Sequence, residues 1–123
     1  MSDHNAEWEG LFRKWWERLN EDGGWTVEIV PGQFVATMAD CECCFSHRTV
    51  SFRYCPSAAP SSFIACHEVV HALVMRLWSP AYDAIQRLGD PGEAIRGYLK
   101  DEMEGTVDSI ARAFLRAYGE SDG

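Results

Sequence analysis

Two histidines set one helical turn apart constrain the folding of this chain more than any other feature. They lie between Ser62 and Trp78, where apolar residues recur at helical spacing. Residues four apart on a helix share one face, so His67 and His71 must point to the same side. The sequence therefore predicts a helix that carries both imidazoles on one face and ends at Ser79-Pro80.

The segment His67-Glu68-Val69-Val70-His71 has the residue types of a zinc site. Two imidazoles on one helix face can reach one zinc ion, and Glu68 can then contact a metal-bound water and take its proton. The alternative is a pair of solvent-exposed histidines on an ordinary amphipathic helix. A catalytic zinc site normally has three protein ligands, so the first interpretation requires another ligand elsewhere in the chain.

An acidic segment from Asp101 to Asp108 offers that ligand. With Val107 as reference and about 100° per residue, Glu104 falls at the edge of the inward helix face, while Glu102 points outward. We therefore expect Glu104 to be the third ligand. Asp108 lies one turn later on the same flank and can accept the second ring N–H of a ligand histidine. The alternative is a solvated acidic face.

Periodicity predicts one helix and three strands before the histidine segment. The helix, over residues 5–20, has an aromatic and aliphatic stripe that we expect to be core, with a partner-binding surface as the alternative. Alternation of apolar and polar residues predicts the strands. The stripe is Trp8, Leu11, Phe12, Trp15, Trp16 and Leu19, and the strands are Trp25–Val30, Gln33–Cys43 and Arg48–Tyr54.

After the histidine segment we expect a short helix over Ala81–Leu88 and a last one from Asp90 to about Tyr118. The apolar positions Ile95 and Leu99 are out of phase with the later stripe, which predicts a bend or break between Gly97 and Asp101. The order of elements predicts a small α+β domain with a three-stranded, mainly antiparallel sheet. With 123 residues, 46% of them hydrophobic, the chain is expected to form a single domain, residues 1–123, with its core over about 25–118.

The charge of the chain bears on its partners. Eleven Lys and Arg against nineteen Asp and Glu give a net charge of −8, which argues against a protein that tracks nucleic-acid phosphates. No apolar run approaches the roughly 20 residues that span a bilayer. The first residues, Met1 to Asn5, have no basic or apolar signal segment, so we expect a cytoplasmic protein, whose oligomeric state stays open.

Five cysteines are an odd number, so they cannot all pair within one chain. We expect Cys41, Cys43, Cys44 and Cys55 to be reduced, partly buried thiols. A second structural zinc and disulfide bonds are the alternatives. Cys66 is expected in the core rather than at the metal, because it lies about 100° around the helix from His67.

The pattern His67-Glu68-Val69-Val70-His71, followed by Glu104-Gly105-Thr106-Val107-Asp108, resembles the gluzincin zinc peptidases, which have HExxH and then ExxxD on a later helix. With the preceding strands, it is similar to small phage and prophage proteins of the minigluzincin and ImmA/IrrE group. The resemblance implies His67, His71 and Glu104 as Zn²⁺ ligands, Glu68 as general base and Asp108 as a residue that orients a ligand.

The resemblance predicts a zinc metalloendopeptidase that hydrolyses a peptide bond of a protein or peptide substrate through a zinc-bound water. The sheet edge nearest the site can hold an extended substrate by strand addition. No counterpart of the Tyr or His that larger relatives use on the oxyanion is found in the sequence. The alternative is therefore a non-catalytic, zinc-stabilised phage protein that binds and modulates a host protein in the host cytoplasm. A third possibility is an interaction domain without metal.

Overall fold

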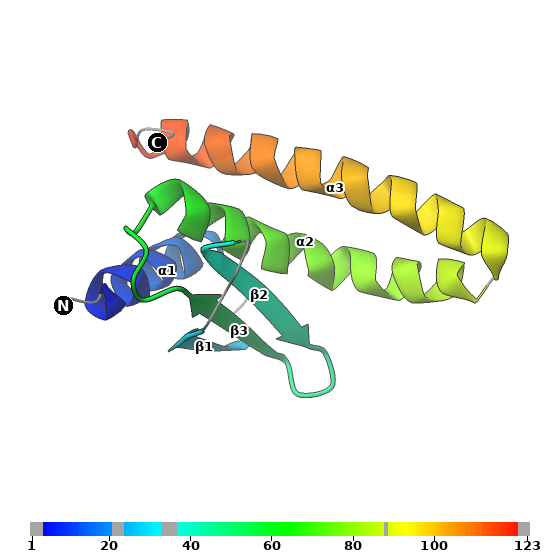
Figure 1. Ribbon diagram of the computed structural model, residues 1–123, viewed down its shortest axis with the longest axis horizontal. Coiled ribbons are helices and arrows are strands. Elements are labelled where there is room, and N and C mark those ends of the chain that lie inside the picture. Colours follow the sequence, from blue (N-terminus) through cyan, green and yellow to red (C-terminus); the bar gives the residue numbers. More distant parts are fainter. Residues whose placement is uncertain (1–3, 21–23, 33–36, 88, 121–123) are drawn as a thin grey trace.

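The computed structural model describes residues 4–20, 24–32, 37–87 and 89–120. Three helices and three strands follow one another as an α+β fold, which confirms the predicted fold class (Figure 1). The elements are α1 (Asn5–Leu19), β1 (Thr26–Pro31), β2 (Ala39–Cys44), β3 (Thr49–Tyr54), α2 (Ser62–Gln86) and α3 (Asp90–Ala117). Strand prediction over residues 33–36 lies outside the described residues.

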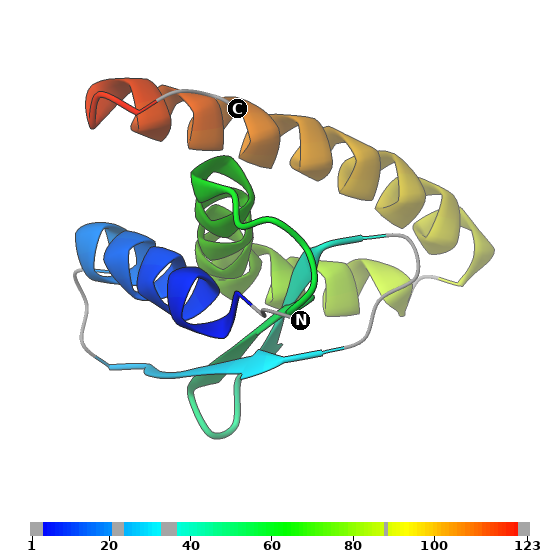
Figure 2. The ribbon, with the colours of Figure 1, turned by 60° about the vertical axis from the view of Figure 1, so that its left-hand side comes forward.

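The molecule is layered from the sheet outward. Helices α1 and α2 cover one face of the sheet, and α3 packs on the side of α2 that faces away from it (Figures 1 and 2). Helix α2 is therefore the central element, in contact with α1, β2 and α3. Because α2 lies between the sheet and α3, its polar side chains are either buried between these layers or lie at the border of the layers, next to solvent.

The sheet is mixed, with strand order β1-β3-β2. Strand β2 pairs antiparallel with β3, but β1 pairs parallel with it, in a register that joins Thr26 to Thr49 and Pro31 to Tyr54. The prediction of a mainly antiparallel sheet is therefore wrong for one of the two strand pairs. The last strand in the sequence, β3, forms the centre of the sheet, so β2 lies at one edge.

The aromatic stripe of α1 forms core, as predicted. Trp8, Phe12 and Trp15 are completely buried, and the Phe12 ring stacks on Phe52 of β3 with ring centroids 4.9 Å apart. The buried indoles keep hydrogen bonds, since Trp15 Nε1 donates to Ser62 Oγ at 2.9 Å. The alternative, in which these tryptophans form a partner-binding surface, is wrong.

Helix α2 runs further than the sequence predicts, whereas α3 has the predicted bounds to within one residue. Ser61 caps α2, with its Oγ accepting a hydrogen bond from the backbone N–H of Ile64 at 3.2 Å. However, α2 continues through Ser79-Pro80 to Gln86, so the predicted end and the separate short helix are wrong. The two helices pack side by side, and this packing offsets the local preference of proline to end a helix.

The chain does not break between Gly97 and Asp101, because α3 is one uninterrupted helix from Asp90 to Ala117. The phase mismatch is resolved differently: Ile95 remains 46% exposed, while Met103 and Val107 are buried against the core. Leaving one apolar side chain in water costs less than breaking a helix here. No helix among the described residues combines the length and the apolar character needed to cross a bilayer.

Candidate metal centre

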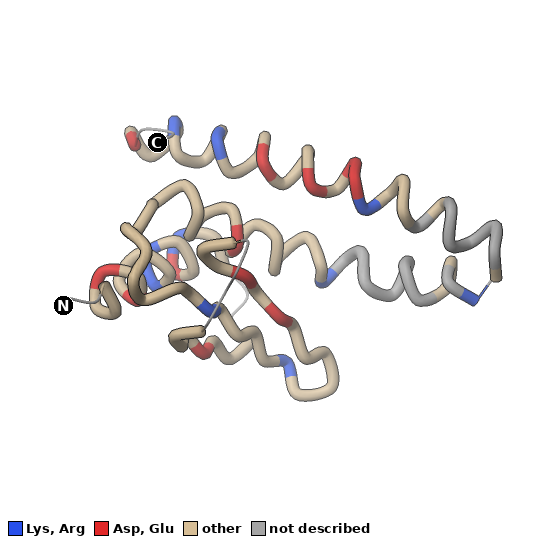
Figure 3. The backbone as a smooth tube through the Cα atoms, in the orientation of Figure 1, with Lys and Arg blue, Asp and Glu red and all other residues tan. Residues whose placement is uncertain are grey.

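A cleft of about 710 Å³ opens where β2, α2 and α3 meet. It contains every residue that the sequence singled out for zinc chemistry. Its lining is Thr37, Met38, Ala39, Asp40, Phe63, Ile64, His67, Glu68, His71, Glu104 and Asp108. Acidic residues gather in the middle of α3, above this region (Figure 3).

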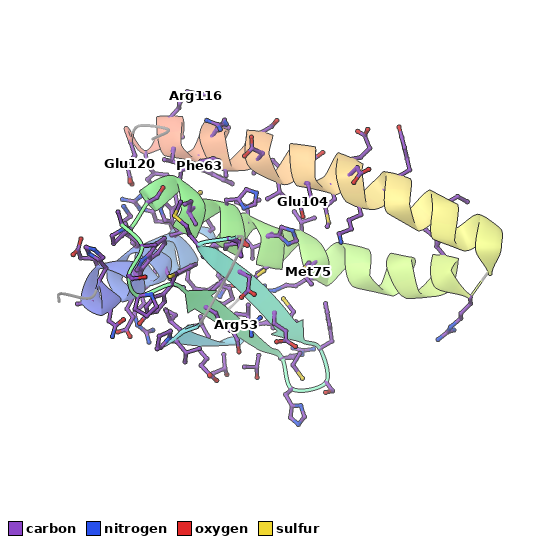
Figure 4. The ribbon with its side chains drawn as sticks, in the orientation of Figure 1. Arg53, Phe63, Met75, Glu104, Arg116 and Glu120 are labelled. Carbon is purple, nitrogen blue, oxygen red and sulfur yellow. The ribbon has the colours of Figure 1, made fainter. Side chains whose placement is uncertain are left out.

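The closest contact in the cleft joins the two helices. His71 Nε2 lies 2.7 Å from Glu104 Oε1, across 33 residues of sequence. Figure 4 shows Glu104 pointing from α3 toward α2. Glu102 is exposed and does not belong to the described lining of the cleft, as the helical phase predicted. The geometry therefore selects Glu104 as the acidic partner of the histidines.

Glu68 is the buried acid of the cleft, with 8% of the residue exposed. Its Oε2 lies 3.6 Å from Nδ1 of His67, and this carboxylate raises the pKa of His67. The rings of His67 and His71 follow one another along α2 with centroids 6.1 Å apart. Two imidazoles and two carboxylates thus meet at one solvent-accessible place.

The donor set fits zinc in its chemistry. Two histidines and one carboxylate are a ligand combination of zinc hydrolases. Among the residues described, no three His, Cys, Asp or Glu side chains already have the arrangement of a formed metal site. Tetrahedral zinc with bonds of about 2.0–2.1 Å separates its ligand atoms by about 3.3 Å, so the 2.7 Å His71–Glu104 contact would have to open by about 0.6 Å.

One atom of the site has an unmet hydrogen-bonding requirement. His71 Nδ1 is buried and has no hydrogen-bond partner within the described part of the chain. Buried polar atoms are nearly always paired, so such an atom marks a place where stability is not the only constraint. The second nitrogen of a zinc-bound histidine normally has a partner that orients the ring, and here the described protein groups do not supply it.

Asp108 lines the cleft as expected but bonds elsewhere. Its Oδ2 accepts a hydrogen bond from Nε of Arg112 at 3.2 Å, and the Arg112 guanidinium lies 4.5 Å from the centre of the Phe63 ring. The predicted role of Asp108 in orienting a ligand histidine stays a prediction.

The sequence did not predict the side of the cleft that is formed by β2 and the two residues before it. Thr37 to Asp40 face the histidines only because β2 packs against α2, and no local spacing in the sequence signals this. Asp40 is held by a double hydrogen bond from Arg53 on β3, with distances of 2.9 and 2.7 Å. Asp40 lies directly opposite Arg53 in the β2–β3 pairing, and this pair can be recognised only once the strand register is known.

None of the five cysteines is paired with another, and Cys41, Cys43 and Cys55 are partly buried as expected. Cys44 is exposed, so the expectation of partial burial is wrong for that residue. Cys66 is buried in the core, as predicted, and burial raises its pKa to about 12. Burial also raises the pKa of Cys41. The alternatives of a second structural zinc and of disulfide bonds stay untested.

Comparisons of the chain with protein-family models, with curated proteins and with solved structures find no match.

Proposed function

We propose that this protein is a zinc-dependent metallopeptidase of the gluzincin type, similar to the minigluzincin and ImmA/IrrE group. His67, His71 and Glu104 are the proposed zinc ligands. The observation that carries the proposal is the contact between His71 and Glu104 across the cleft that the buried Glu68 also lines. These residues come from two helices and have the types and order of the zinc-peptidase pattern.

Zinc in this position would polarise a substrate carbonyl and make a water molecule acidic enough to be deprotonated near neutral pH. Glu68 supplies the proton transfer. Its carboxylate takes the proton of the attacking water and then delivers it to the departing amine. Burial of Glu68 suits this role, because it limits competing hydrogen bonds with bulk water.

The edge of β2 is the proposed substrate-binding strand. Strand β2 pairs with β3 on one side only, so its other edge has no strand partner in the described sheet. Ala39 and Asp40 at the start of β2, and Thr37 and Met38 just before it, line the same cleft as Glu68. An extended peptide added along this edge would bond through its backbone and cross the histidine pair.

A second function uses the same metal site without turnover. Among the described residues that line the cleft there is no Tyr, and both histidines are proposed ligands. No side chain of the kind that larger relatives place on the oxyanion is therefore present in that lining. This favours, as the second candidate, a zinc-stabilised protein that binds a host protein.

The variant Glu68→Gln separates the two functions. It keeps the side-chain size and removes the base, so zinc content and melting temperature should change little, while hydrolysis of a peptide library should fall by about 100-fold or more. Glu102→Gln, on the exposed side of α3, is the matched control and should retain activity. Equal hydrolysis by the wild type and Glu68→Gln would remove Glu68 as the base. If both proteins bind zinc and act identically in a biological assay without hydrolysing any peptide, turnover is excluded and the binding function remains.

A further inference from the structure

A cluster of three side chains lies at the other end of β2 from the cleft, at the tip of the β2–β3 hairpin. Cys44 Sγ lies 3.3 Å from Nδ1 of His47 and 3.4 Å from Oγ of Ser46. Ser46 Oγ and His47 Nδ1 are themselves 3.1 Å apart. All three residues are exposed, so the thiol can be reached from solvent.

We propose that Cys44 is a reactive thiol that forms mixed disulfides with small disulfide compounds. This site is independent of the proposed metal site. It requires neither zinc nor any residue of the cleft.

The cluster favours the thiolate, which is the form of cysteine that attacks. Hydrogen bonds from Ser46 and then His47 lower the pKa of Cys44 from 9.0 to about 7. At pH 7 the thiolate fraction therefore rises roughly 50-fold, and the lower basicity of the sulfur reduces the reactivity of each thiolate about 8-fold. The net expectation is a reaction about 6-fold faster than that of an ordinary exposed thiol.

The reaction is an exchange. The Cys44 thiolate attacks one sulfur of the small disulfide, a new S–S bond forms, and the original S–S bond breaks. The other half leaves as a thiolate, which takes up the proton that Cys44 has lost. One disulfide is consumed and one is formed, so no further oxidant is needed.

The chain contains its own controls. Cys55 Sγ lies 3.3 Å from Oγ of Ser57, a similar hydroxyl contact, but the groups that lower its pKa include no imidazole. Cys66 is completely buried, and burial raises its pKa. Reactivity should therefore fall from Cys44 to Cys55 and then to Cys66.

Oxidised glutathione is the probe. The full chain, in buffer with a metal chelator, is incubated at several values between pH 5.5 and 9, quenched with acid and mapped by mass spectrometry of its peptides. Cys44 should be modified first, with a pH midpoint near 7. His47→Ala and Ser46→Ala should each slow Cys44 about twofold or more, and the double variant should react like Cys55.

Two results would overturn the proposal. One is a wild-type rate at Cys44 no higher than at Cys55. The other is a Cys44 rate that the double variant leaves unchanged. If the substitutions disturb folding, the wild-type pH profile decides alone, and a midpoint near 9 rejects the activated thiol. The cleft variant His71→Ala should leave the rate at Cys44 unchanged, and this keeps the test separate from that of the peptidase.

Discussion

Two polar clusters on the first turns of α2 differ in how their charges are balanced. At the start of the helix, Glu120 accepts hydrogen bonds from Lys14 at 2.8 Å and from Arg18 at 2.6 Å, and also bonds to the Ser62 hydroxyl. This Glu120 cluster ties the end of the described chain to α1 and α2 (Figure 4). Partial burial raises the pKa of Glu120, but hydrogen bonds from Lys14, Ser62 and Arg18 outweigh this and lower it to about 2.

The cleft lies less than three turns further along α2 and has the opposite character. Two carboxylates, Glu68 and Glu104, face imidazoles instead of permanently charged cations. A buried ring nitrogen of His71 has no partner in the described residues. A cluster that satisfies itself holds the fold together, whereas a cluster that leaves groups unsatisfied is suited to a ligand.

The largest expected effect is on metal binding at the cleft. Wild-type protein purified without chelator should hold about one zinc per chain, and His71→Ala should lose most of it, with affinity reduced about 100-fold or more. Metal analysis after dialysis measures this. His47→Ala is the matched control, because that imidazole lies at the exposed hairpin tip, and it should keep the zinc. Full zinc content in His71→Ala would remove the proposed site.

A somewhat smaller effect should separate the two neighbouring glutamates of α3. Glu104→Gln should weaken zinc binding about 10- to 100-fold, because its carboxylate meets His71, while the exposed Glu102→Gln should have no effect. Calorimetric titration with zinc gives both affinities. The proposed ligand set would be wrong if the two variants bound zinc equally well.

In the Glu120 cluster the expected effect is on stability alone. Glu120→Gln leaves two cations without their carboxylate and should lower the free energy of unfolding by about 1–2 kcal/mol at pH 7. Urea denaturation measures the change, with the exposed Glu17→Gln as control. Zinc content should stay unchanged in both variants. An effect on zinc would contradict the separation of the two clusters.

The same carboxylate predicts a dependence on pH. The pKa of Glu120 falls from 4.5 to about 2 on folding, so its stabilisation is complete above about pH 4.5 and is lost as the pH falls toward 2. The difference in unfolding free energy between wild type and Glu120→Gln should shrink over this window. A difference that stays constant down to pH 2 would show that the ion pairs contribute nothing.

Local patterns predicted those parts of the molecule that local physics determines. The stripe of α1 and the position of Glu104 at the edge of the inward face of its helix follow from helix geometry, and the structure has both of them. The shared face of His67 and His71 follows from their spacing alone. These features need no knowledge of the neighbouring elements.

The parts that the sequence did not predict depend on tertiary packing. The alternation of apolar and polar residues determines only which face of the sheet a side chain occupies. It does not determine the direction of a neighbouring strand, so the parallel pairing of β1 with β3 depends on how the elements pack. Helix α2 passes Pro80 because α3 lies beside it. The contribution of Asp40 to the cleft has the same origin, as it depends on the packing of β2 against α2.

The short connection between α2 and α3 lies far along both helices from the cleft. His71 precedes the end of α2 by 15 residues and Glu104 follows the start of α3 by 14, which places the turn roughly 22 Å from their contact. If the helices pivoted there by about 5°, the two side chains would separate or approach by about 2 Å. Gly89 sits in this turn with φ of 78°, a conformation that other residues adopt only with strain. A change in the angle between α2 and α3 at the connection that contains Gly89 would therefore change the distance between the proposed ligands.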